Sequence, residues 1–155
     1  MSVPRHFATS VCFALAFLVA VSGVAAAPAT VTDPETGLAI NGFDPVTYFT
    51  DATPRPGRPD MEYRRNGVIW RFRNEGNRAA FADDPNVYAP QFGGYDPVAI
   101  ARGTSVPGHP LFWLVTAQRL YLFYSKEARD EFAAQPQNVL VQAQRRWPEV
   151  QRSLP

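Results

Sequence analysis

The clearest pattern in the sequence is an alternation of hydrophobic and polar residues around Asn66-Gly67. Trp70 and Phe72 alternate with arginines, which indicates a strand with one buried face and one face in solvent. Asn-Gly favours the positive φ angles of a tight type I′ turn. The pattern therefore predicts a β-hairpin with strands at 61–65 and 68–73.

A second hairpin is predicted over 112–116 and 119–124, with its turn at Ala117-Gln118. Helices are predicted where Asp, Asn or Ser stands in a position to accept hydrogen bonds from the first backbone N–H groups. These N-cap residues are Asp44, Asn74, Asp96 and Ser125. The predicted helices are 45–49, one from Asn74 to Asp84-Pro85, one from Asp96 to Gly103, 126–134 and 137–147. Loops are expected at 53–59 and 103–110.

These elements recur at a spacing of about fifty residues. Residues 42–46 align with 94–98, and the segment from Phe72 to Pro85 aligns with that from Phe123 to Pro136. Either a duplication or the chance use of similar caps explains this internal pseudo-repeat. Two hairpins and several short helices predict an α+β fold, a small antiparallel sheet of two hairpins covered by the helices.

The first 26 residues have the layout of a secretory signal peptide. Arg5 and His6 precede the hydrophobic run 11–21, and small residues at 22–27 offer a cleavage site, for which we favour Ala26. An uncleaved membrane anchor over 11–29 is the alternative, although no basic flank follows it. We therefore expect a periplasmic or secreted protein, with a flexible lead-in at 27–38, a domain at 39–150 and no stable membrane insertion after cleavage.

Charge and cysteine content exclude several classes of protein. The chain has 15 Lys+Arg and 14 Asp+Glu, so removing Arg5 with the signal leaves equal numbers. Nucleic-acid binding needs a basic excess on one face, and none is expected here. The one cysteine, Cys12, lies in the predicted signal. The remaining chain then has no thiol for a disulfide, a thiolate metal site or a nucleophile.

Catalytic patterns are weak. Ser105 stands four residues before His109 without the Gly-x-Ser-x-Gly turn of a serine hydrolase. The spacing indicates neither paired carboxylates nor a glycine-rich nucleotide-binding loop. We expect a protein that is not an enzyme and holds no cofactor, and a hydrolase using Ser105 and His109 is the alternative.

Four segments resemble exported bacterial YHS domain proteins: 41–49, 63–72, 77–95 and 120–126. The similarity runs from about Ala39 to Trp147 and is most specific around 88–95. The resemblance implies a small α+β domain, often secreted or periplasmic. A metal-binding role has been inferred for YHS domains at large, and the role of the exported branch is uncharacterised. Asp96 stands where these relatives usually carry cysteine, so a thiolate site does not carry over, and a carboxylate would favour harder metals.

We therefore expect an exported binding or accessory module of the YHS type, with an unknown protein or small molecule as its ligand. The Pro/Gly-rich segment 88–95 holds three aromatic residues and either lines a cleft or plugs the core. The candidate ligand-binding residues are Tyr88, Phe92, Tyr95, Asp96 and His109. The alternative is a metal site made by Asp44, Asp96 and His109. The competing interpretation is that both aspartates are N-caps and bind no metal.

Overall fold

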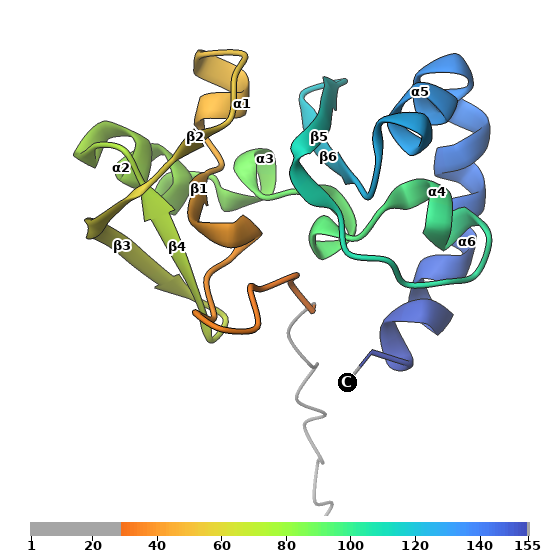
Figure 1. Ribbon diagram of the computed structural model, residues 1–155, viewed down its shortest axis with the longest axis horizontal. Coiled ribbons are helices and arrows are strands. Elements are labelled where there is room, and N and C mark those ends of the chain that lie inside the picture. The colour runs from red at the N-terminus through yellow and green to blue at the C-terminus, as the bar shows by residue number, and fades with distance from the viewer. Residues whose placement is uncertain (1–28, 155) are drawn as a thin grey trace, which may run out of the picture.

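The computed structural model describes residues 29–154, so the predicted signal peptide lies outside the described residues. The chain forms two halves that lie side by side in Figure 1: an N-terminal half, residues 40–88, and a C-terminal half, residues 91–152. Each half contains one long hairpin with helices packed against it. The expected α+β class is confirmed.

The order of elements follows the predicted pattern closely. The N-terminal half contains η1 (Ile40–Gly42), β1 (Phe43–Asp44), α1 (Thr47–Thr50), β2 (Arg55–Pro56), β3 (Arg58–Arg65), β4 (Val68–Phe72), α2 (Glu75–Asp83) and α3 (Pro85–Tyr88). The C-terminal half contains η2 (Gln91–Gly94), α4 (Pro97–Ala101), β5 (His109–Thr116), β6 (Arg119–Phe123), α5 (Lys126–Ala134) and α6 (Pro136–Arg152). In residues 29–154 the antiparallel pairs β1-β2, β3-β4 and β5-β6 are three separate two-stranded sheets, and the two hairpins do not join into one sheet.

Several boundaries differ from the prediction. The proline-rich segment 53–59 contains β2, because Pro56 pairs only with β1 and a strand at a sheet edge tolerates proline. The segment 88–95, expected as a loop, contains the 3₁₀ turn η2. Helix α6 continues past Trp147 and through Pro148, since Val150 is buried against Ile100 and Ala143 and holds the last turn in place.

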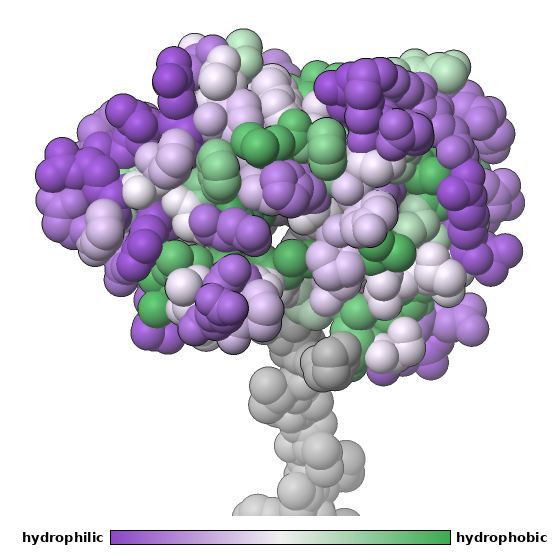
Figure 2. Space-filling model, viewed as in Figure 1, coloured by the Kyte–Doolittle hydropathy of each residue, from purple (hydrophilic) through white to green (hydrophobic). Residues whose placement is uncertain are grey.

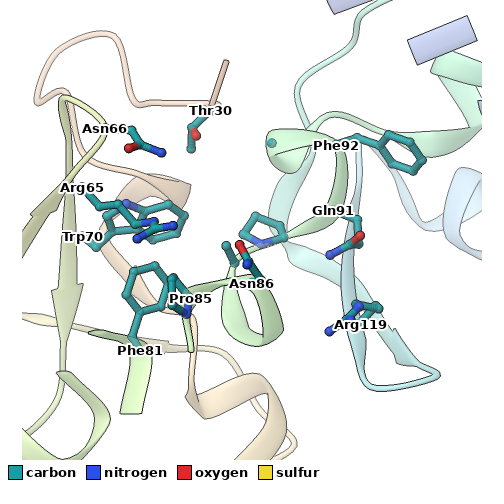
Figure 3. A pocket seen from close by; sticks show the side chains of 13 residues that line it. Thr30, Arg65, Asn66, Trp70, Phe81, Pro85, Asn86, Gln91, Phe92 and Arg119 are labelled. Carbon is teal, nitrogen blue, oxygen red and sulfur yellow. The ribbon is translucent and has the colours of Figure 1, made fainter. Parts of the chain in front are cut away.

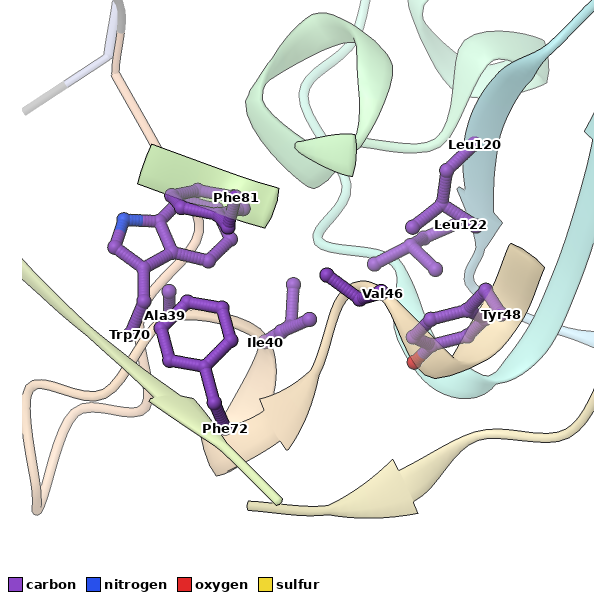
Figure 4. Packing of buried hydrophobic residues seen from close by; sticks show 9 residues of the cluster. All are labelled: Ala39, Ile40, Val46, Tyr48, Trp70, Phe72, Phe81, Leu120 and Leu122. Carbon is purple, nitrogen blue, oxygen red and sulfur yellow. The ribbon is translucent and has the colours of Figure 1, made fainter. Parts of the chain in front are cut away.

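The main core belongs to both halves. Trp70, Phe72 and Phe81 of the N-terminal half pack in one buried cluster with Leu120 and Leu122 of β6 (Figure 4). Val46 lies between these two groups of side chains in Figure 4, and Tyr48 lies on the side of Leu120 and Leu122. Two further clusters, centred on Phe123 with Phe132 and on Ile100 with Ala143, lie within the C-terminal half.

Matched positions of the two halves make the same local contacts. Three consecutive residues have positive φ in η1 (Ile40, Asn41, Gly42), and three have it in η2 (Phe92, Gly93, Gly94). The Gly57 N–H donates to the Gly42 carbonyl at 2.8 Å, and the Gly108 N–H donates to the Gly94 carbonyl at 2.9 Å. The aligned segments therefore adopt similar backbones, and a duplication as their origin stays a prediction.

The described part of the predicted lead-in packs against the domain. Val31 is buried, and its N–H donates to the Gly93 carbonyl at 2.8 Å. Thr32 bridges to Ala39, and Leu38 bridges to Ile69. Across residues 29–154, every helix is too short or too polar to span a bilayer. On the face shown in Figure 2, hydrophilic side chains gather at the two outer sides, and hydrophobic ones lie nearer the line between the halves.

Candidate functional site

A cavity of about 380 Å³ lies between the two halves, and we call it the interhalf cavity (Figure 3). Trp70 and Phe81 of the main core form an apolar wall on one side. Polar side chains of Asn66, Asn86 and Gln91 supply hydrogen-bonding groups along the lining. The remaining lining residues are Thr30, Arg65, Pro85, Ala89, Pro90, Phe92, Gly93 and Arg119.

Two arginines are placed at this cavity by the two hairpin turns. Arg65 is the last residue of β3 and pairs with Val68 across the first turn. Arg119 is the first residue of β6 and pairs with Thr116 across the second. The guanidinium groups come from opposite sides of the cavity in Figure 3. Two hairpins that do not share a sheet thus each contribute one cation to the same space.

The charge in the interhalf cavity is not neutralised by its own lining. Its described lining contains Arg65 and Arg119 and no aspartate or glutamate. Neither arginine forms an ion pair with a carboxylate in residues 29–154. The cavity is therefore electropositive and suited to an anion.

The three aromatic rings predicted at 88–95 do not face this cavity together. The Tyr88 ring makes an edge contact with Phe49. The Phe92 ring is turned away from the cavity in Figure 3 and packs on Trp147, with the ring centroids 5.6 Å apart. Tyr95 also packs on Trp147. These rings fill space between elements, whereas the segment around Gln91 borders the interhalf cavity.

Asp44 and Asp96 are buried, with 0% and 2% of their surface exposed. The Asp44 carboxylate accepts the Val46 N–H at the start of α1, and the Asp96 carboxylate accepts the Val98 N–H at the start of α4. Asp96 is therefore the N-cap of α4, as one interpretation of the sequence expected. Asp44 is not the N-cap of α1, because that helix begins at Thr47 with Val46 as its N-cap, two residues after Asp44. Asp96 also lines a second cavity of about 310 Å³, which we call the Asp96 cavity.

His109 lines neither the interhalf cavity nor the Asp96 cavity. It is the first residue of β5, where a loop was expected, and its side chain is exposed. Its Nδ1 atom accepts the Leu111 N–H at 3.2 Å. Within residues 29–154, no three or more His, Cys, Asp and Glu side chains gather in a way that could hold a metal ion. The structure therefore gives no support to a metal site formed by Asp44, Asp96 and His109.

Arg65 and Arg119 were not among the residues singled out from the sequence. The pair Arg64-Arg65 indicates the solvent-exposed face of a strand. Arg119 belongs to no recognisable sequence motif. The available signal was position: each arginine directly adjoins one of the two hairpin turns. That signal becomes informative only when the packing of the two hairpins is known.

Comparison with known proteins adds no further assignment: no family model, no curated protein and no solved structure matches this chain. The resemblance to YHS domain proteins accordingly stays a prediction from the sequence.

Proposed function

We propose that this chain is an exported, non-enzymatic binding module of the YHS type that binds a small organic carboxylate in the interhalf cavity. The observation that carries the proposal is the pair Arg65 and Arg119, which enter one cavity that has no acidic residue in its described lining. Arginine is well suited to carboxylates because its planar guanidinium presents parallel N–H donors.

The shape and chemistry of the cavity limit the size of the ligand. Its volume, about 380 Å³, lies near the lower end of the roughly 300–1,000 Å³ range of small-molecule sites. Trp70, Phe81 and Ala89 are apolar lining residues, while Asn86 and Gln91 offer hydrogen bonds. These features favour a compact carboxylate with a short apolar or aromatic body.

The lining also supports binding rather than catalysis. Among its described residues are no His, Cys, Ser, Lys, Asp or Glu, the side chains that most often act as nucleophiles or general bases. The hydroxyl of Thr30 is the one side-chain hydroxyl there. A ligand in this cavity would therefore be held by charge and apolar contact.

A calorimetric titration with benzoate tests the proposal, with benzamide as the uncharged probe of matching shape. We expect saturable benzoate binding that weakens roughly tenfold or more in Arg65→Gln and in Arg119→Gln, because each loses a charge-assisted hydrogen bond. Arg64→Gln is the matched control, since Arg64 neighbours Arg65 but is exposed and outside the cavity lining.

Equal binding of benzoate and benzamide would contradict the proposal, as would benzoate binding that both cavity variants leave unchanged. If benzoate gives no saturable signal, the proposal is also wrong.

A further inference from the structure

The two buried aspartates have different sets of hydrogen-bond donors. In the N-terminal half, Asp44 Oδ1 accepts the Val46 N–H at 2.9 Å. Asp44 Oδ2 accepts two donors, the Arg73 N–H at 2.8 Å and the Asn77 side-chain amide at 2.7 Å. The amide of Asn77 thus supplies a second donor to Oδ2 of a carboxylate that has no exposed surface.

In the C-terminal half, the matching carboxylate lacks the side-chain donor. Asp96 Oδ1 accepts the Val98 and Ala99 N–H groups at 2.7 and 3.4 Å. Asp96 Oδ2 accepts the Tyr124 N–H at 2.9 Å. Tyr124 follows β6 as Arg73 follows β4, so the backbone donor is retained. A carboxylate offers about four acceptor sites, and Oδ2 has room for one more donor.

The missing donor corresponds to a single substitution between the halves. Asn77 is the third residue of α2 and Ala128 is the third residue of α5. Their backbone N–H groups make the same contact, with the N-cap side chains of Asn74 and Ser125 respectively. Ala128 has no polar atoms in its side chain. The Asp96 cavity is bordered by both Asp96 and Ala128, so it lies where the Asn77 amide lies in the other half.

The lining of the Asp96 cavity favours a cation. It contains Asp96, Glu127 and Glu131 against one arginine, Arg102. The Arg102 guanidinium is already engaged, because it donates to both Glu131 carboxylate oxygens at 2.7 Å. Tyr124 also lines the cavity and is 65% exposed, so its ring is available to cover a cation.

We propose that the Asp96 cavity is a second binding site, which takes the primary ammonium group of a small amine. The ammonium would donate to Asp96 Oδ2 in place of the absent amide and would lie beside the Tyr124 ring. Its compact head and three donors suit a site bordered by carboxylates. The inference goes beyond the carboxylate site and does not depend on it, since the two cavities share no lining residue.

Titration of the ¹⁵N-labelled protein with methylammonium chloride tests this site, with sodium chloride at equal ionic strength as the reference. We expect saturable shifts of the Val98, Ala99 and Tyr124 amide signals, because these N–H groups donate to the carboxylate that would bind the ammonium. The benzoate titration tests the interhalf cavity in a separate experiment. A negative result at one site therefore leaves the proposal for the other site intact.

Ala128→Asn is the decisive variant, because it installs the side-chain donor of the N-terminal half. We expect it to weaken methylammonium binding roughly tenfold or more, as the new amide occupies Asp96 Oδ2. Ala133→Asn makes the same change at an exposed position of α5 outside the lining and should leave binding unchanged. Tyr124→Ala keeps the backbone donor and should weaken binding severalfold through loss of the ring.

Three results would overturn the proposal: no saturable shift with methylammonium, equal shifts with sodium, or unchanged binding by Ala128→Asn. Thermal melting of each variant shows whether it is folded. The test does not depend on replacing Asp96, whose loss would also remove the cap of α4 and the contact with Tyr124.

Discussion

At the scale of single residues, two buried aspartates join the start of a short helix to the end of a hairpin strand. The Asp44 carboxylate accepts hydrogen bonds from the Val46 N–H and from the Arg73 N–H. Arg73 lies 29 residues after Asp44 in the sequence. Asp96 makes the same link through Val98 and Tyr124. A buried carboxylate is costly unless its oxygens are hydrogen-bonded. In both halves the backbone N–H groups meet this requirement, and the carboxylate in turn fixes the chain around it.

Replacing Asp44 by Asn should destabilise the protein strongly. All three donors to this carboxylate point at oxygen atoms, so the new amide NH₂ must face at least one N–H group. We expect a loss of about 2–3 kcal/mol in the free energy of unfolding, the typical worth of a buried hydrogen bond to a charged group. Urea denaturation followed by tryptophan fluorescence measures it. Asp51→Asn, at an exposed position, should change stability little, and equal losses in the two variants would contradict this role for Asp44.

At the scale of elements, both hairpins have turns with positive φ at both central residues. Asn66 and Gly67 have φ angles of 50° and 80°, as their residue types favour. Ala117 and Gln118 have φ angles of 47° and 55°. Residues of these types adopt positive φ only at a steric cost in free energy, because the Cβ atom comes close to the backbone. The second turn is therefore strained where the first is not, although the register on either side is the same.

Gln118→Gly should therefore stabilise the protein. Glycine adopts positive φ without the steric cost of a Cβ, and that relief exceeds the extra entropy of the unfolded chain. We expect a gain of about 0.5–1 kcal/mol in the free energy of unfolding. Gly67→Ala is the reciprocal variant, and we expect it to lower the free energy of unfolding by a similar amount. Beyond Gly67 and its two chain neighbours, no described residue has an atom within 4 Å of the position of the added Cβ, so the loss would come from the positive φ alone. The prediction is wrong if Gln118→Gly leaves the denaturation midpoint unchanged or lowers it.

The elements show why part of the structure was predictable from the sequence. Asn74 and Ser125 cap α2 and α5 as predicted, because a cap depends on residues three or four positions away. The end of α6 was missed because the local effect of Pro148 is outweighed by the burial of Val150. The interhalf cavity was missed for the same reason: Arg65 and Arg119 are 54 positions apart by their numbering, and only the packing of the two hairpins brings them to one space.

At the scale of the whole molecule, the two halves share one core and are expected to unfold together. The main cluster takes side chains from both hairpins, and Tyr48 lies where the halves meet. Its ring makes an edge contact with Trp113 of β5, and its hydroxyl donates to the Pro110 carbonyl at 2.9 Å. Because the apolar contacts cross between the halves, removing one half would expose the core of the other.

Tyr48 should also make stability fall in alkaline solution. Burial, and then the negative charge of Asp44, raise the pKa of the Tyr48 phenol above its usual value. The folded state keeps this proton to higher pH than the unfolded state, where a tyrosine pKa is about 10. The stabilisation is therefore complete below about pH 10 and is lost as pH rises beyond that value. Burial raises the pKa of Tyr121 in the same direction, so both phenols contribute to the fall.

Tyr48→Phe separates the two contributions. At neutral pH it leaves the Pro110 carbonyl without the Tyr48 donor, and we expect a loss of about 1 kcal/mol in the free energy of unfolding. Above about pH 10 its stability should fall less steeply than that of the unmodified protein, because the variant lacks the Tyr48 phenol and its raised pKa. Urea denaturation at a series of pH values measures both effects, with Tyr124→Phe as the exposed control. If the stability of Tyr48→Phe and of the unmodified protein falls in parallel with pH, the Tyr48 phenol does not contribute to the alkaline loss of stability, and the prediction is wrong.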